Sequence, residues 1–134
     1  MTASEDSVQS SSEVESSGSI VQTVYTQRHF KLRTAVDRLD DNPIGDQWEY
    51  LASINGGKVP EEMDLNVGDV ITIDLQFTEQ DEYPDVGTAS GQYTVKAEDL
   101  VNGFELSLDL TVPENAGKGK GLCAYFKVTF TFEP

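Results

Sequence analysis

Strict alternation of apolar and polar residues is the feature that most limits how this chain can fold. Apolar residues recur at every second position in VITIDLQF (70–77), FELSLDLTV (104–112) and YFKVTFTF (125–132). Successive side chains of a β-strand point to opposite faces, so each stretch predicts a strand with one face in a core and one in water. No stretch has a convincing helical pattern, and the best candidate for a helix is one turn at AEDL, 97–100.

Weaker strand patterns lie at 24–36, 47–54 and 91–97, and turn sequences rich in Gly, Asn and Pro separate the runs. Short strands joined in this way typically form two packed antiparallel sheets. We therefore predict an all-β fold, an antiparallel Greek-key β-sandwich of six to eight strands. The segment INGGKVPEEMDLNVGD (54–69) is predicted to form a hairpin. The residues expected in the core are Phe77, Leu106, Leu108, Val128 and Phe130.

The first twenty residues have a different composition, rich in serine and acidic residues and poor in apolar ones. Such a segment buries too little apolar surface to offset the entropy lost on ordering. We predict a disordered tail or linker at 1–20 and a β-sandwich domain at 21–134. No signal peptide is visible in this chain. A spacer of this composition is common between a cell surface and a folded module, so an extracellular or cell-surface location is expected, and a cytosolic origin is the alternative.

The charge balance limits the possible partners. The chain has 24 acidic and 9 basic residues and a net charge of −15. Nucleic acid and strong membrane binding are disfavoured, because phosphate backbones and anionic lipids would be repelled. A divalent cation would be attracted. The expected partners are therefore a divalent cation and, in addition, another protein or a cell-surface component.

Several residue types associated with catalysis are scarce. Cys123 is the only cysteine and His29 the only histidine, which excludes an internal disulfide and argues against a zinc or iron–sulfur site. Both are interpreted as structural residues of strands. Trp48 and Tyr50 share a strand face and are expected to fill the core. The stretch ENAGKGKG (114–121) lacks the spacing of a phosphate-binding loop and is interpreted as a hairpin loop.

Two acidic stretches interrupt the strand pattern, RLDDNPIGDQWEYL (38–51) and TEQDEYPDVG (78–87). In a Greek-key sandwich their loops can emerge at the same end, where the carboxylates would converge and repel one another. Calcium takes six to eight oxygen ligands in flexible geometry, and acidic loops supply them. The predicted metal ligands are Asp40, Asp41, Asp46, Glu79, Asp81 and Asp85. The alternative is that both stretches are solvated turns that bind no metal, because Asp and Asn favour turns by bonding their own backbone.

The spacing of these acids resembles that of the calcium-dependent lipid-binding β-sandwich of synaptotagmins and protein kinase C, the C-two domain. Asp40 and Asp46, separated by five residues and followed by QWEY, are similar to its first calcium loop. Glu79-Gln80-Asp81 and then Asp85-Val86-Gly87 are similar to its third, although Glu79 stands where that family has Asp. The resemblance also extends over AEDLVNGFELSLDLTV and AYFKVTFTF, and it implies a Ca²⁺-binding sandwich.

The function expected from the sequence is that of a non-enzymatic binding module that holds Ca²⁺ between two acidic loops at one end of the sandwich. Asp40, Asp46, Asp81 and Asp85 would be the main ligands, assisted by Asp41 and Glu79. The alternative is a metal-free interaction or spacer domain of a bacterial surface protein or lipoprotein. A small hydrolase that uses two carboxylates is a third hypothesis.

Overall fold

The protein is almost entirely β-structure, as predicted. The computed structural model describes residues 7–15, 18–40, 47–80, 84–114 and 121–134. The described part of the chain holds no helix with the length and hydrophobicity needed to cross a bilayer. In chain order, the elements are β1 (Ser7–Glu15), β2 (Gly18–Arg38), β3 (Trp48–Ile54), β4 (Gly57–Lys58), β5 (Glu62–Asn66), β6 (Val70–Glu79), β7 (Val86–Thr94), α1 (Ala97–Asn102), β8 (Phe104–Pro113) and β9 (Cys123–Glu133).

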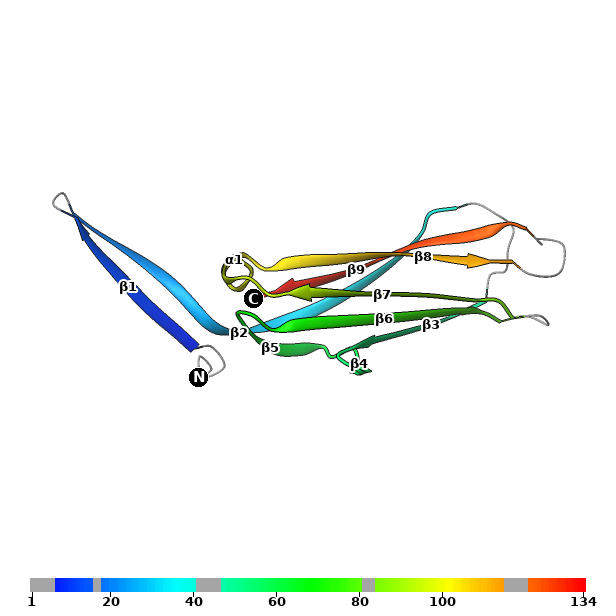
Figure 1. Cartoon of the computed structure of the whole chain (residues 1–134), viewed down its shortest axis with the longest axis horizontal. Helices are drawn as coiled ribbons and strands as arrows, with labels where there is room; N and C mark the ends of the chain where they lie inside the picture. The colour runs from blue at the N-terminus through cyan, green and yellow to red at the C-terminus, as the bar shows by residue number, and fades with distance from the viewer. Residues whose placement is uncertain (1–6, 16–17, 41–46, 81–83, 115–120) are drawn as a thin grey trace.

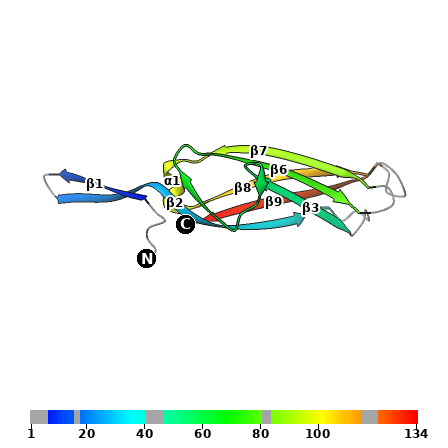
Figure 2. The same cartoon turned by 90° about the horizontal axis from the view of Figure 1, so that it is seen from below.

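The strands form two antiparallel sheets that pack as a sandwich (Figures 1 and 2). The first sheet has the order β1-β2-β9-β8, and β5 also pairs with β2; the second has the order β4-β3-β6-β7. Several neighbours, such as β2 with β9 and β3 with β6, are far apart in sequence, as expected for Greek-key connections. The second half of β2 and the strands β3–β9 make up the sandwich, and β1 with the first half of β2 lies beyond it, so the prediction of a β-sandwich is confirmed.

The alternation seen in the sequence sets the inner faces of the sheets. On β6 the odd-numbered residues from Ile71 onward are buried, and on β9 the even-numbered residues from Ala124 to Phe132 are buried. Phe77, Val128 and Phe130 are in the core as expected. The other two expected core residues, Leu106 and Leu108, are only partly buried and pack against the core, because β8 pairs with β9 on one side only.

Aromatic side chains join the two sheets. The ring of Phe126 on β9 lies 5.0 Å from Phe77 on β6 and 4.9 Å from Trp48 on β3, both in edge-on geometry. Tyr50 contacts the Phe77 ring at 4.6 Å, although its side chain is half exposed at the edge of the sandwich. Edge-on aromatic pairs at these distances add to the stabilisation from burial. Trp48 is partly buried against the core, whereas the prediction that Tyr50 fills the core is wrong, because β3 is an edge strand at this position and leaves half of the Tyr50 side chain exposed.

The segment 54–69 is not a hairpin, contrary to the prediction. The hairpin turn lies between β3 and β4, where Asn55 (φ 53°) and Gly56 (φ 80°) both have positive φ and Ile54 pairs with Gly57. Two such residues form the two-residue turn whose twist matches that of antiparallel strands, and Asn-Gly is its preferred sequence. The chain then crosses to the other sheet, where β5 pairs with β2.

The N-terminal region contains a strand that the sequence did not predict. β1 pairs with the first half of β2, from Ser7 opposite Gln27 to Glu15 opposite Gly18, and Figure 1 shows this hairpin projecting beyond the sandwich. The disordered tail at 1–20 and the domain boundary at residue 21 stay predictions to be tested. A two-stranded hairpin without a third strand is marginally stable in water.

The short helix α1 connects the two sheets between β7 and β8. The Asp99 carboxylate accepts hydrogen bonds from the backbone N–H of Lys96 (2.9 Å) and from the Tyr93 hydroxyl (2.6 Å). The bond to Lys96 fixes the first turn of the helix. The bond to Asp99, together with burial and the negative charges of Asp99 and Glu98, raises the pKa of Tyr93 from 10.0 to about 12.

Because core side chains differ in burial, we expect their truncation to lower the free energy of unfolding by different amounts. Phe130 is fully buried, so we expect Phe130→Ala to lower the free energy of unfolding by about 3–5 kcal/mol. Leu108→Ala should lower the free energy of unfolding by less, about 1–2 kcal/mol. Leu108 lies at a partly buried edge position, so only part of its side chain leaves water on folding. Urea denaturation of both variants measures the two losses. An equal or reversed order would contradict the observed position of β8.

The Tyr93–Asp99 contact predicts an alkaline transition. Because the folded-state pKa of Tyr93 lies above its ordinary value, this contribution to stability is complete below pH 10 and is lost as the pH rises through about 12. In an ultraviolet phenolate titration, the folded protein should show a phase near pH 12 that is absent from Tyr93→Phe. Asp99→Asn should move that phase toward pH 10. A phase unaffected by either change would refute the assignment.

We expect the backbone amides of the N-terminal hairpin to be poorly protected from hydrogen exchange. The described partner strand of β1 is β2, and the sequence of β1 contains only two apolar residues, Val8 and Val14, so little apolar surface is available to stabilise this ladder. Amide hydrogens of residues 8–15 should exchange much faster than those of 126–132, and protease should remove β1 while the sandwich stays folded. Equal protection in both segments would show that β1 is an integral part of the domain.

Candidate metal centre

Three acidic side chains meet at one end of the sandwich. Glu79 is the last residue of β6, Asp85 directly precedes β7, and Glu114 directly follows β8. This end lies opposite the one that carries α1 and the N-terminal hairpin (Figure 1). Glu79 and Asp85 belong to one sheet and Glu114 to the other, so this triad lies where the two sheets meet.

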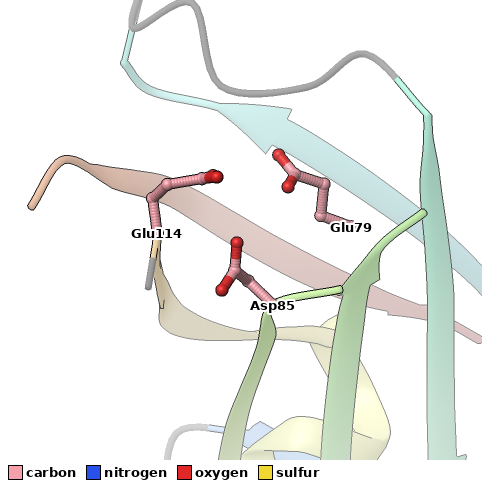
Figure 3. Close-up of side chains that lie close together, drawn as sticks. All are labelled: Glu79, Asp85 and Glu114. Carbon is pink, nitrogen blue, oxygen red and sulfur yellow. The ribbon is translucent and has the colours of Figure 1, made fainter. Parts of the chain in front are cut away.

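The triad is compact and buried. Each side chain offers a carboxylate oxygen, and the three oxygens lie within 4.8 Å of one another (Figure 3). Only 1% of the Glu79 surface, 2% of Asp85 and 8% of Glu114 is exposed to solvent. Ionised carboxylates at such separations repel one another, and burial weakens the screening by water. Nearby positive charge, from a cation or from the protein itself, would therefore stabilise the arrangement.

Backbone hydrogen bonds hold the three residues in place. The Glu79 N–H donates to the Asp85 carbonyl at 2.9 Å and so closes the loop between β6 and β7. The Glu114 N–H donates to the Leu122 carbonyl at 2.9 Å, and the Gly121 N–H donates to the Glu114 carbonyl at 3.1 Å. These bonds extend the ladder between β8 and β9 beyond the last strand residues. The carboxylates therefore project from well-supported backbone.

Strand alternation explains why two of these acids face inward. Glu79 continues the inward series of β6 two positions after Phe77, and Glu114 continues that of β8 two positions after Val112. Both positions lie just past the last apolar side chain of their series. The period of two therefore places a carboxylate at the end of each apolar row.

Of the three predicted ligands that lie within the described residues, the structure brings together two, Glu79 and Asp85. The predicted ligands Asp41, Asp46 and Asp81 lie outside the described residues. The remaining one, Asp40, is not part of the triad. Among the described residues, Glu79, Asp85 and Glu114 form the one group of three acidic, Cys or His side chains close enough to hold a single metal ion.

Asp40 has a structural role in the described part of the chain. Its carboxylate accepts a hydrogen bond from the Tyr125 backbone N–H at 2.7 Å and forms an ion pair with Arg38 at 3.1 Å. The Arg38 guanidinium in turn lies 5.5 Å from the centre of the Trp48 ring. These contacts fix the chain where it leaves β2, so Asp40 acts as an anchor of that strand end.

Glu114 was missed in the sequence because it was read together with the glycine-rich stretch that follows it. The signal that identifies it is the alternation of FELSLDLTVPE, in which the even-numbered positions continue through Pro113 to Glu114. If the strand is taken to end at Val112, the inward-facing position of Glu114 is not recognised. The contact with Glu79 and Asp85 depends on the packing of the two sheets and has no local signal in the sequence.

Other titratable groups do not assemble a second centre of this kind among the described residues. His29 lies between two carboxylates of β5, with its Nδ1 2.7 Å from Asp64 and its Nε2 in contact with Glu62. Cys123 begins β9, and a hydrogen bond between its side chain and Tyr125 raises the pKa of Tyr125. His29 and Cys123 lie toward opposite ends of the β2–β9 ladder, so they form no catalytic pair.

Comparisons of the chain with models of protein families, with curated proteins and with solved structures find no match.

Proposed function

We propose that the protein is a non-enzymatic binding module that holds a Ca²⁺ ion between Glu79, Asp85 and Glu114. The observation that carries the proposal is the burial of three carboxylates whose oxygens lie within 4.8 Å of one another. Oxygen atoms bound to one Ca²⁺ at about 2.3–2.6 Å lie at most ~5 Å apart, so the triad fits around this ion with little movement. The acidic loops resemble those of the C-two domain in sequence, and this resemblance, which also implies Ca²⁺ binding, is part of the proposal.

The chemistry of the ligands favours calcium over other metals. The triad contains only carboxylate oxygens, whereas zinc and copper sites usually include His or Cys. Three carboxylates supply up to six oxygens, and waters or nearby carbonyls complete a shell of six to eight. Asp81, two positions after Glu79 in the sequence, is an additional acidic residue in the same connection. Magnesium dehydrates reluctantly and suits such a buried all-protein site less well.

The consequence of binding would be mechanical. Glu79 and Asp85 lie at the ends of β6 and β7 in one sheet, and Glu114 lies at the end of β8 in the other. An ion held by all three would tie the two sheets together at this end and fix the connections that leave it. A binding surface for another protein or a cell-surface component would then be ordered by Ca²⁺.

The cell surface is the setting that suits such a module. Calcium sites of extracellular modules have dissociation constants of about 10⁻⁴–10⁻³ M. The serine- and acid-rich N-terminal region would serve as a spacer there. The rival is a metal-free interaction domain in which positive charge from the protein offsets the triad. The candidates for that role are Arg38, whose guanidinium lies 5.5 Å from the centre of the ring of Trp48, the strand partner of Glu79, and, from the sequence, Lys118 and Lys120.

Calcium should raise the thermal stability of the protein. An ion that binds only the folded state stabilises it by about 2.7 kcal/mol at a hundredfold excess over the dissociation constant. We therefore expect 10 mM Ca²⁺ to raise the melting temperature by several degrees relative to EDTA, and Mg²⁺ to do less. Glu79→Gln and Glu114→Gln should each abolish the calcium effect. Glu105→Gln, on the exposed face at the far end of β8, is the matched control and should retain it.

A spectroscopic measurement separates binding at the triad from binding elsewhere. Trp48 is the only tryptophan and pairs directly with Glu79 across β3 and β6. Tb³⁺ bound in place of Ca²⁺ should therefore emit when Trp48 is excited, and Glu79→Gln should remove the emission. A melting temperature indifferent to Ca²⁺ and EDTA, together with a loss of stability in the Lys118→Gln/Lys120→Gln variant, would refute the metal site and support the metal-free module.

A further inference from the structure

The outer face of the second sheet carries a groove remote from the triad. It has a volume of about 770 Å³ and lies over β3, β6 and β7, with the β3–β4 hairpin as one wall. Figure 1 shows these strands side by side, with β4 at their edge. The floor is formed by outward-facing side chains, among them Asp74 and Gln76, which are exposed on β6.

The strand register arranges the polar groups of this groove in rows. One row crosses all four strands, from Lys58 through Ser53 and Asp74 to Ser90. Adjacent strands are about 4.8 Å apart, so this row extends over ~14 Å. The next row, two residues along, contains Leu51, Gln76 and Thr88. The groove therefore presents a cationic group, a carboxylate, an amide, three hydroxyls and one exposed leucine on a shared surface.

These groups are not engaged with one another. Within the described residues, no side-chain hydrogen bond or ion pair uses Ser53, Asp74, Gln76, Thr88 or Ser90. The outer face of the other sheet differs, because Ser107 bonds Thr129 at 3.1 Å and Arg33 pairs with Glu133. The second sheet thus offers a set of donors and acceptors that is open to a ligand.

The wall of the groove is held in position. The Asn55 side chain accepts a hydrogen bond from the Thr72 N–H at 2.9 Å, and the Asn55 N–H donates to the Thr72 carbonyl at 2.8 Å. These bonds attach the tip of the hairpin to β6. Gly56 and Gly57 carry no side chains, so a ligand can approach the backbone of the wall closely. A groove that is fixed before binding loses less entropy when a ligand binds.

We infer that this groove binds a neutral saccharide. Asp74 only accepts hydrogen bonds and Lys58 only donates them, whereas sugar hydroxyls do both and can satisfy the two in one row. Leu51, 59% exposed, offers an apolar contact for the C–H face of a sugar ring. The single ammonium of Lys58 and the single carboxylate of Asp74 lie in the same row, so the charges of the groove balance and select neither an anionic nor a cationic ligand. The lining residues include no aromatic ring, so binding should be weak.

Titration of the ¹⁵N-labelled full chain tests the inference. The probes are the neutral trisaccharides maltotriose, cellotriose and mannotriose, with 3′-sialyllactose and trilysine as the anionic and cationic comparisons. At least one neutral trisaccharide at millimolar concentration should shift the amide signals of Ser53, Asp74, Gln76 and Ser90. EDTA should leave this effect unchanged, which separates it from the metal centre.

Matched variants locate the site. Asp74→Asn and Gln76→Ala should each weaken binding at least tenfold with an unchanged melting temperature. Asp109→Asn and Thr129→Ala, on the outer face of the other sheet, should leave saccharide binding unaltered. The inference is wrong if no neutral trisaccharide shifts these signals, if only the charged probes do so, or if both groove variants bind as tightly as the parent protein.

Discussion

The contact between the inner faces of β6 and β9 is the interaction on which the rest of the structure depends. Phe77 and Phe126 meet there at 5.0 Å, and Trp48 joins them from β3. This packing fixes which face of each strand turns inward, because a shift by one residue would exchange the two faces. Glu79, two positions after Phe77, is therefore directed into the sandwich by the same packing that buries the phenylalanine.

The alternation of β6 supplies two different surfaces from one strand. Its odd-numbered positions line the core and end in the triad at Glu79, whereas the even-numbered positions Asp74 and Gln76 form the floor of the groove. The inward-facing Glu79 of the triad and the groove are thus on opposite faces of the same sheet. A change in the register of β6 would disturb both, while a substitution at either surface leaves the other in place.

The parts of the fold that could be predicted from the sequence are those governed by local period. β6, β8 and β9 follow from alternation, and the Asn-Gly turn after Ile54 is a strong local signal. The pairing of β5 with β2 could not be predicted, because a five-residue strand in an acidic segment carries no information on its partner. For the candidate metal centre, sequence reasoning selected Glu79 and Asp85 but also Asp40, whose ion pair with Arg38 depends on where β2 ends.

The length of β2 has a consequence for how the molecule would bear load. This strand leaves the sandwich at the end where β9 finishes, with Lys31 paired to Glu133 as the last step of their ladder. Because the two strands are antiparallel, a pull on the hairpin and on the end of β9 would act first on this step and on the adjoining bonds between Gln27–Lys31 of β2 and β5. The hydrogen bonds would then break one after another, as in a zipper, and not all together as in shear. The fold would resist tension weakly from this end, starting at the exposed Arg33–Glu133 ion pair.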